Sequence, residues 1–114
     1  MSELPSRGEI RLADLSPVRR RQQAGTRPCL VVSTDVFNHG PAELVMVLPL
    51  ATRDRRIPLH VPLEKAESGL DARSYIKCED LRSVSRVRLT RRVGAVGSPT
   101  LDAVNDRLRI LLEL

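Results

Sequence analysis

The feature that most constrains this 114-residue chain is a succession of short apolar runs, each ended by proline, glycine or polar residues. Runs of about four to eight residues rich in valine, isoleucine and leucine are typical of β-strands. The predicted strands are 9–15, 29–33, 44–50, 57–63, 75–78 and 93–96. Only 98–112 repeats its leucines and valine at helical spacing. The chain is therefore predicted to be mainly β with a C-terminal helix, as a small barrel closed by that helix.

The predicted strands differ in how much of each is buried. The run 9–15 alternates polar and apolar residues, which predicts a half-buried strand. The runs 29–33 and 44–50 are almost continuously apolar and are predicted to be buried on both faces. The run 57–63 contains two prolines, so we expect it at a sheet edge with His60 on its solvent face.

The length predicts one domain, 1–114, with a short flexible lead at 1–6 and a closing helix at 98–112. Ser98 is predicted to cap this helix, and Pro99 suits its first position. The residues predicted to form its buried face are Leu101, Val104, Leu108, Leu111 and Leu112.

Three polar segments are predicted to connect the strands. The segment 18–28 is too polar for a core and long enough to be a functional loop. The segment 51–56 is predicted to be a basic turn, and 80–92 is a basic stretch between two short strands.

Positive charge is the most unusual property of the composition. Lysine and arginine number 19 against 14 acidic residues, and 17 of the 19 are arginine. Guanidinium groups pair with phosphate in a bidentate way, so this excess favours a polyanionic partner. A GC-rich genome, which encodes arginine in place of lysine, is the alternative explanation. The basic clusters are 19–21, 53–56 and 82–92.

Other composition features exclude several classes of protein. Two aromatic residues, Phe37 and Tyr75, are too few for a base-stacking RNA platform. No apolar run reaches the roughly 20 residues of a membrane span, and the first residues do not resemble a secretory signal. Cys29 and Cys78 are too few for a disulfide framework or a zinc site. We therefore expect a cytoplasmic protein without a membrane partner.

Candidate catalytic side chains are scarce. His39 and His60 are predicted to be solvated surface residues, and Cys29 to be a packed core residue. The acidic residues show no metal-ligand spacing. Arginine, threonine and backbone groups remain, and these suffice to help the 2′-hydroxyl of RNA attack its adjacent phosphate. On the residues alone, this reaction is one option among several.

The order of short motifs narrows the options. Arg27-Pro28 precedes an apolar strand, and Pro49 is followed by a turn that carries a hydroxyl. From about Arg7 to Leu114, the chain resembles the MazF/PemK family of toxin ribonucleases. The matching segments are 7–10, 14–15, 23–28, 30–33, 48–50, 57–61, 69–70, 79–84 and 88–89.

The resemblance implies an SH3-like barrel of the CcdB/PemK type that works as a homodimer. It implies a sequence-specific, metal-independent endoribonuclease that needs no cofactor and cleaves single-stranded RNA. The implied products carry a 2′,3′-cyclic phosphate and a 5′-hydroxyl. The implied partner is a cognate antitoxin whose acidic and apolar C-terminal segment occupies the RNA groove.

The resemblance also implies roles for individual residues. Arg27 matches the catalytic arginine of the family. The family usually has a catalytic threonine where this chain has Ala51, so Thr52 is predicted to take that role. The residues predicted to contact RNA are Arg19, Arg20, Arg21, Gln22, Gln23, Arg53, Arg55, Arg56, Arg82 and Ser83. Arg86, Arg88, Arg91 and Arg92 are predicted to form a solvated basic face.

Two alternatives stay open. A CcdB-like toxin of the same fold would bind DNA gyrase without catalysis, although the aliphatic C-terminus lacks the aromatic residues of such toxins. An inactive RNA-binding relative is the other alternative, because Ala51 replaces the family threonine.

Overall fold

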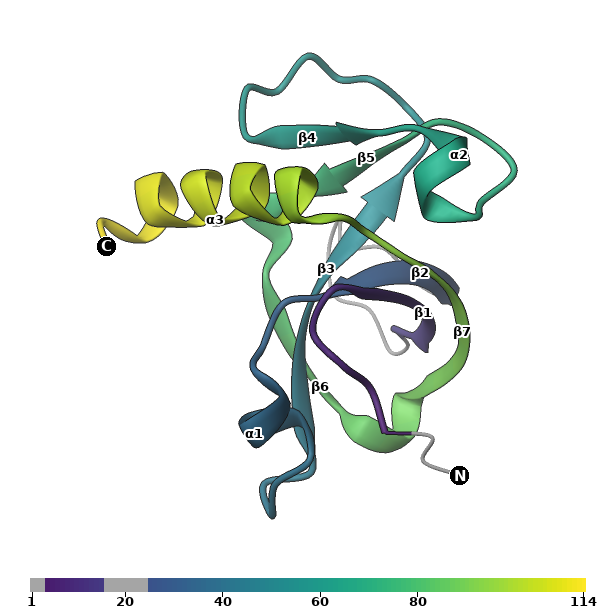
Figure 1. Ribbon diagram of the computed structural model, residues 1–114, viewed down its shortest axis with the longest axis vertical. Coiled ribbons are helices and arrows are strands. Elements are labelled where there is room, and N and C mark those ends of the chain that lie inside the picture. The colour runs from purple at the N-terminus through teal and green to yellow at the C-terminus, as the bar shows by residue number, and fades with distance from the viewer. Residues whose placement is uncertain (1–3, 16–24) are drawn as a thin grey trace.

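The computed structural model describes residues 4–15 and 25–114 (Figure 1). The predictions for residues 1–3 and 16–24 lie outside the described residues. The strands are β1 (Glu9–Asp14), β2 (Thr26–Val31), β3 (Leu44–Ala51), β4 (His60–Leu63), β5 (Ser74–Lys77), β6 (Arg82–Ser85) and β7 (Leu89–Ala95). The α-helices are α1 (Asp35–Asn38), α2 (Lys65–Ser68) and α3 (Ser98–Leu112), and the 3-10 helices are η1 (Cys78–Asp80) and η2 (Arg86–Arg88). None of the helices in the described ranges is long and apolar enough to cross a membrane.

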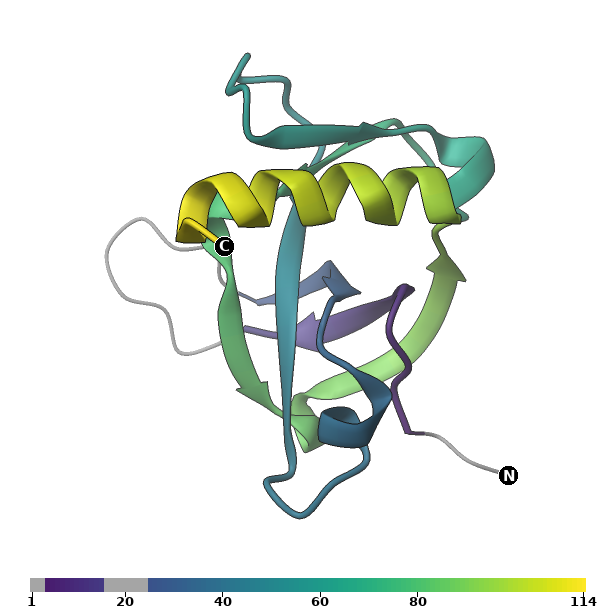
Figure 2. The ribbon, with the colours of Figure 1, turned by 60° about the vertical axis from the view of Figure 1, so that its left-hand side comes forward.

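The strands form one antiparallel, strongly curved sheet in the order β4-β5-β3-β2-β1-β7, with β6 paired to β3 (Figure 2). The prediction of a mainly β fold with a C-terminal helix is confirmed. The barrel is not closed, because β4 and β7 end the hydrogen-bonded path in the part of the chain that the structure describes.

Strand β3 organises the sheet because it has a different partner along each part of its length. Its first half pairs with β6, and residues Val47, Leu48 and Pro49 pair with β2. Its last two residues, Leu50 and Ala51, pair with β5. The end of β3 therefore lies between the start of β2 and β5, and this junction forms the candidate site described below.

The sheet is buried on both faces, as the continuous apolar runs predict. Alternation along β3 sends Val45 and Val47 into one core cluster and Leu48 and Leu50 into the other. Helix α3 covers the second cluster through the fully buried Val104 (Figure 2).

Helix α3 has the predicted bounds, but two details of the prediction are wrong. Ser98 does not cap it, because the N-cap is Gly97 and the Glu67 carboxylate accepts from the Gly97 N–H (2.8 Å) and from Thr100 Oγ1 (2.7 Å). Leu111 and Leu112 were predicted to be buried and are 37% and 52% exposed. The helix extends past the sheet at this end, so its last turn has nothing to cover (Figure 1).

Strand β4 lies at the sheet edge, as its prolines predict, but it begins only at His60. His60 is not on a solvent face: it is 7% exposed, and its Nε2 is hydrogen-bonded to Glu79 Oε2 at 2.8 Å. The prediction failed because this pairing joins β4 to η1, two segments that are separated in the sequence and meet only in the fold.

Other segments also differ from the predictions. Strand β2 begins at Thr26, inside the predicted loop, and the basic stretch 80–92 contains β6 and η2. Pro5 is fully buried, and the Ser6 N–H donates to Glu9 Oε1 (2.8 Å), so residues 4–6 are anchored rather than part of a flexible lead.

Candidate active site

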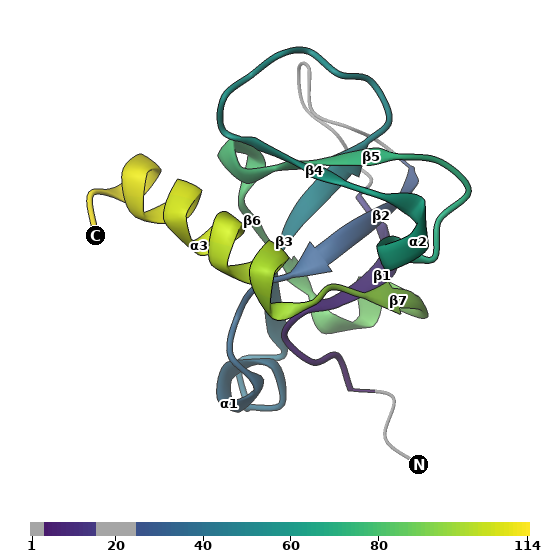
Figure 3. The same cartoon turned by 45° about the horizontal axis from the view of Figure 1, so that its top comes forward.

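A cleft of about 530 Å³ opens where the start of β2, the end of β3 and strand β5 meet. The loop 52–59, which follows β3, lies at the same end of the molecule as β4 and β5 (Figure 3). The lining residues of the cleft are Arg27, Pro28, Leu50, Ala51, Thr52, Arg53, Arg55, Ser74 and Lys77.

Arg27 and Thr52, the two predicted catalytic residues, both line this cleft. Arg27 is held by β2, where it pairs with Ala13 of β1. Strand β3 ends at Ala51, and Thr52 is the first residue after it. A one-residue shift inside a strand would turn the hydroxyl to the opposite face, but this shift falls at the strand end. Ala51 and Thr52 can therefore both reach the cleft.

The predicted RNA-contact residues divide into three groups. Arg53 and Arg55 line the cleft with Arg27. Arg56 is exposed on the same loop but outside the cleft lining, and its N–H donates to Asp54 Oδ1 (2.8 Å). Residues 19–23 lie outside the described part of the chain.

Arg82 and Ser83 form the third group, and they lie on β6, outside the cleft lining. Ser83 is exposed opposite Met46. Arg82 is largely buried, and its Nη2 donates to Asp80 Oδ2 at 2.7 Å. Their RNA contacts stay a prediction.

Lys77 is a cleft residue that the sequence did not single out. Its Nζ lies 3.6 Å from Asp80 Oδ2, so the carboxylate that binds Arg82 also holds this ammonium. Lys77 reaches the site because β5 pairs with the last residues of β3. A lone lysine beside a cysteine carries no signal of this pairing.

The cleft is strongly cationic. Its lining includes Arg27, Arg53, Arg55 and Lys77, and no carboxylate lines it among the described residues. A concave surface lined by one sign of charge concentrates counter-ions, here phosphate groups. The arrangement can therefore bind a phosphodiester and stabilise extra negative charge on it.

The cysteines offer no nucleophile at this site. Cys29 follows the lining residue Pro28 on β2 and is fully buried, with its thiol 3.7 Å from the Arg27 carbonyl oxygen. Burial raises the pKa of Cys29 to about 12, although nearby Arg82 opposes the shift. Burial likewise raises the pKa of Cys78 to about 11. The prediction that Cys29 is a packing residue is confirmed.

No set of three histidine, cysteine or acidic side chains within 4–15 and 25–114 is arranged to hold a metal ion. His39 is exposed, as predicted, and its Nε2 donates to the Pro5 carbonyl (2.7 Å).

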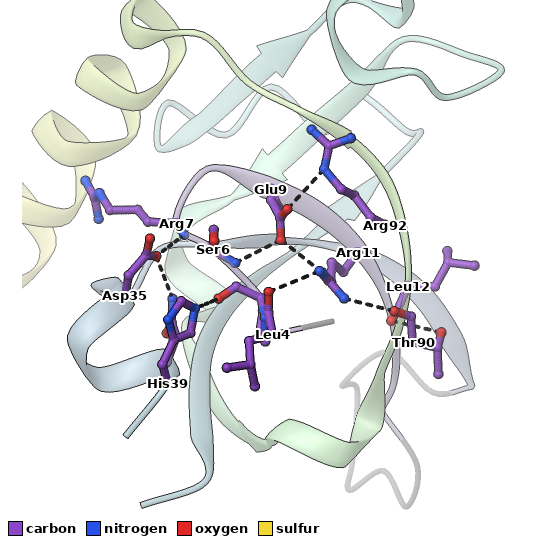
Figure 4. A network of polar contacts seen from close by, with 12 residues as sticks. Leu4, Ser6, Arg7, Glu9, Arg11, Leu12, Asp35, His39, Thr90 and Arg92 are labelled. Atoms are coloured by element: carbon purple, nitrogen blue, oxygen red, sulfur yellow. Dashed lines mark hydrogen bonds and ion pairs between the residues drawn. The ribbon is translucent and has the colours of Figure 1, made fainter. Parts of the chain in front are cut away.

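A second arginine-rich region lies around Glu9, and its cations are paired (Figure 4). Glu9 Oε1 accepts from Arg11 Nε and Glu9 Oε2 accepts from Arg92 Nε, both at 3.0 Å. Arg11 is 5% exposed and also donates to the carbonyls of Thr90 (3.2 Å) and Leu4 (3.3 Å). These arginines hold the N-terminal segment against β1 and β7.

The predicted solvated basic face is only partly present, because Arg91 and Arg92 are exposed whereas Arg86 and Arg88 are half-buried. Arg92 is paired with Glu9, and Arg86 donates to the carbonyls of Asn38 (2.8 Å) and Gly40 (3.2 Å). Arg88 donates to the Asp14 carbonyl (3.3 Å). These side chains join β1, α1 and η2.

Comparison with known proteins places the chain in a family. Residues 6–112 match the PemK-like, MazF-like toxins of type II toxin–antitoxin systems. Endoribonuclease EndoA of Bacillus subtilis (strain 168) is 32% identical over 109 residues, which cover 95% of this chain and 94% of the relative.

Solved structures show the same fold. MazF from Deinococcus radiodurans is 24% identical, with a TM-score of 0.86 over 99% of this chain and 100% of that chain. An endoribonuclease from a mycobacterial species, in complex with its cognate antitoxin, is 23% identical, with a TM-score of 0.77 over 99% and 97% of the two chains. With a family match over nearly its whole length, the chain belongs to the PemK-like, MazF-like toxins of type II toxin–antitoxin systems.

Proposed function

We propose that this MazF-type toxin endoribonuclease cleaves single-stranded RNA at specific sequences without a metal ion, and that the cleft around Arg27 is its active site. The observation that carries the proposal is that Arg27 and Thr52 share one cleft with three further cations and with no carboxylate among the described lining residues. Such a site suits a reaction in which the substrate brings its own nucleophile.

The proposed reaction is an internal transfer at one phosphate. The 2′-oxygen forms a bond to phosphorus as its proton passes to solvent water, and the bond from phosphorus to the 5′-oxygen breaks as that oxygen takes a proton from water. The products are a 2′,3′-cyclic phosphate and a 5′-hydroxyl. The protein must orient the 2′-hydroxyl and stabilise the negative charge of the pentacovalent intermediate.

The cleft residues have separate roles in this reaction. Arg27 donates hydrogen bonds to the non-bridging phosphate oxygens, because a guanidinium has N–H donors and no acceptor. Thr52 donates its hydroxyl to the same phosphate and helps to orient it. Arg53, Arg55 and Lys77 bind the flanking phosphates and raise the local concentration of RNA.

The same charge distribution supports an antitoxin partner. An extended acidic and apolar segment can occupy a cationic cleft whose floor includes Pro28 and Leu50. We propose that such a segment of a cognate antitoxin competes with RNA, that the toxin acts as a homodimer, and that both work in the cytoplasm.

The test is cleavage of a long single-stranded RNA by the purified protein in EDTA, with mapping of the new 5′ ends. The proposal predicts cuts at a recurring short sequence and 5′-hydroxyl ends. RNA that is bound and left intact would identify an inactive RNA-binding relative. RNA that is neither bound nor cut, with inhibition of DNA gyrase, would favour the CcdB-like alternative.

A further inference from the structure

Tyr75 lies beside the cleft, and we propose that its ring stacks against one base of the bound RNA. This inference rests on the proposed endoribonuclease function and adds to it a subsite for an unstacked nucleobase. It also revises the expectation from composition that this protein holds RNA without an aromatic surface.

Strand register puts Tyr75 next to residues that line the cleft. Tyr75 pairs with Ala51 of β3 on one side and with Pro62 of β4 on the other. Residues directly opposite in antiparallel strands project to the same face, as do residues two apart along one strand. Ala51 and Lys77 both line the cleft, so Tyr75 shares a face of the sheet with two lining residues, while Leu50 and Ser74 line the cleft from the other face.

The neighbours of Tyr75 leave room for a ligand. Ala51 offers only a methyl group, and Pro62 is exposed and has no long side chain. Tyr75 itself is half-buried, so part of its side chain is open to solvent. A rigid aromatic ring in this setting is a ready surface for a flat ligand.

A cation accompanies the ring. The Arg73 guanidinium carbon lies 5.5 Å from the ring centroid, and Arg73 Nε pairs with Glu64 Oε2 at 2.8 Å. This distance is within the range of a cation–π contact. Arg73 thus contacts the ring, and Glu64 helps to hold the guanidinium in place. An aromatic ring next to arginine is a recurrent way to hold single-stranded nucleic acid.

Stacking at this position serves the proposed chemistry. Attack by the 2′-hydroxyl requires the nucleotides beside the scissile phosphate to leave their helical stack. A base anchored on Tyr75 fixes the chain next to the cations of the cleft and lowers the entropy cost of orientation. Because every base has a π face, the subsite contributes more to affinity than to the choice of base.

The experiment uses the tyrosine itself as the probe. The chain has one tyrosine and no tryptophan, so its intrinsic tyrosine fluorescence reports on Tyr75 alone. The full-length protein is titrated with a 2′-O-methyl oligoribonucleotide that spans a mapped cleavage site and cannot be cut there. We expect saturable quenching, with the same Kd as fluorescence anisotropy of the labelled oligonucleotide.

Three variants separate stacking from structure. Tyr75→Leu is expected to raise Kd and KM about tenfold and to change kcat less, and Tyr75→Phe to stay within about twofold of wild type. The matched control is Phe37→Leu on α1, at the opposite end of β3 from Ala51, which should leave RNA binding unchanged (Figure 1). One abasic position in the oligonucleotide should weaken binding to wild type and not to Tyr75→Leu.

The outcomes distinguish this subsite from the function on which it rests. Wild-type protein that cleaves and binds RNA with unchanged tyrosine fluorescence, and with no sensitive abasic position, would overturn the subsite alone. Wild-type protein that neither binds nor cleaves RNA would overturn the proposed function and the subsite together. If Tyr75→Leu fails to fold, the fluorescence titration and the abasic series on wild-type protein still decide.

Discussion

Two regions of this molecule are rich in arginine, and they use it in opposite ways. Around Glu9, Arg11 and Arg92 share one carboxylate, and Arg11 also binds backbone carbonyls (Figure 4). In the cleft, Arg53 and Arg55 form no ion pair with any described residue. In the first region the positive charge is paired within the protein, and in the second region two exposed arginines are left without a carboxylate partner among the described residues.

The difference shows that the number of arginines alone does not reveal which of them can bind a phosphate. The positions of the carboxylates in the fold decide this. A guanidinium bound to a carboxylate stabilises the fold, and its charge is neutralised for a distant phosphate. Cations gathered around a concavity that no carboxylate lines raise the local potential instead. Substitutions in the two regions should therefore change different measured quantities.

The largest expected effect is on catalysis. Arg27→Ala should lower the single-turnover cleavage rate by about 100- to 1000-fold, because it removes a preorganised donor to the charge that develops on phosphate. Stability should change by no more than about 0.5 kcal/mol, since Arg27 is exposed. Arg92→Ala in the other region is the control and should cleave at close to the wild-type rate. Equal losses in both variants would break the comparison.

Next in size is the loss of stability from the Glu9 region. Arg11→Ala should lower the free energy of unfolding by about 3 kcal/mol, because it removes a buried guanidinium that binds the largely buried Glu9 carboxylate and two backbone carbonyls. Urea denaturation followed by circular dichroism measures this change. Arg53→Ala, which removes an exposed cleft cation, should not shift the midpoint. A midpoint for Arg11→Ala equal to that of wild type would show that the network is not structural.

The third effect is the dependence of stability on pH that comes from the buried thiol of Cys29. In the folded protein, burial raises the pKa of Cys29 from its ordinary value of 9.0 to about 12. Above pH 9 the folded state therefore binds more protons than the unfolded state, so stability is undiminished below pH 9 and falls as pH rises toward 12. The loss is about 1.4 kcal/mol per pH unit for one fully buried thiol.

Comparing urea midpoints of wild type and Cys29→Ala between pH 8 and pH 10 isolates this contribution. The wild-type midpoint should fall more steeply than that of the variant. Parallel pH profiles of the two proteins would mean that the Cys29 thiol is accessible to solvent in the folded state.

The smallest effect should come from Thr52. Thr52→Ala should reduce cleavage by about tenfold, the equivalent of one lost hydrogen bond, and Thr52→Ser should retain most of the rate. Adding Ala51→Thr to Thr52→Ala tests whether the hydroxyl can act from the family position. Rates are measured on one RNA at saturating protein. A wild-type rate for Thr52→Ala would remove Thr52 from the mechanism.

Much of the fold follows from local pattern, and the exceptions have a common cause. Alternation and continuous apolar runs are local, so β1, β3 and the bounds of α3 were predictable. Strand β6 was not predictable from such a pattern, because only Val84 of its four residues is buried in the core. The burial of His60 depends on Glu79, which approaches only through the folded chain.

The site divides in the same way. Arg27 and Thr52 were predictable because motif order resembles a family, and the structure brings both to one cleft. The place of Lys77 in the cleft was not predictable, because it depends on the pairing of β5 with β3. Arg86 and Arg88 are neighbours of other basic residues in the sequence, yet each binds a different carbonyl in the fold.

The central claim is that the cleft supplies charge and orientation while RNA supplies the nucleophile. The most direct measurement places a single 2′-deoxynucleotide immediately 5′ to the scissile phosphate of a mapped site and follows cleavage in EDTA. The account predicts that this RNA binds with nearly unchanged affinity and is not cut, whereas the all-ribose RNA yields a 2′,3′-cyclic phosphate. Cleavage of the substituted RNA at the wild-type rate would contradict the account, because the nucleophile would then come from elsewhere.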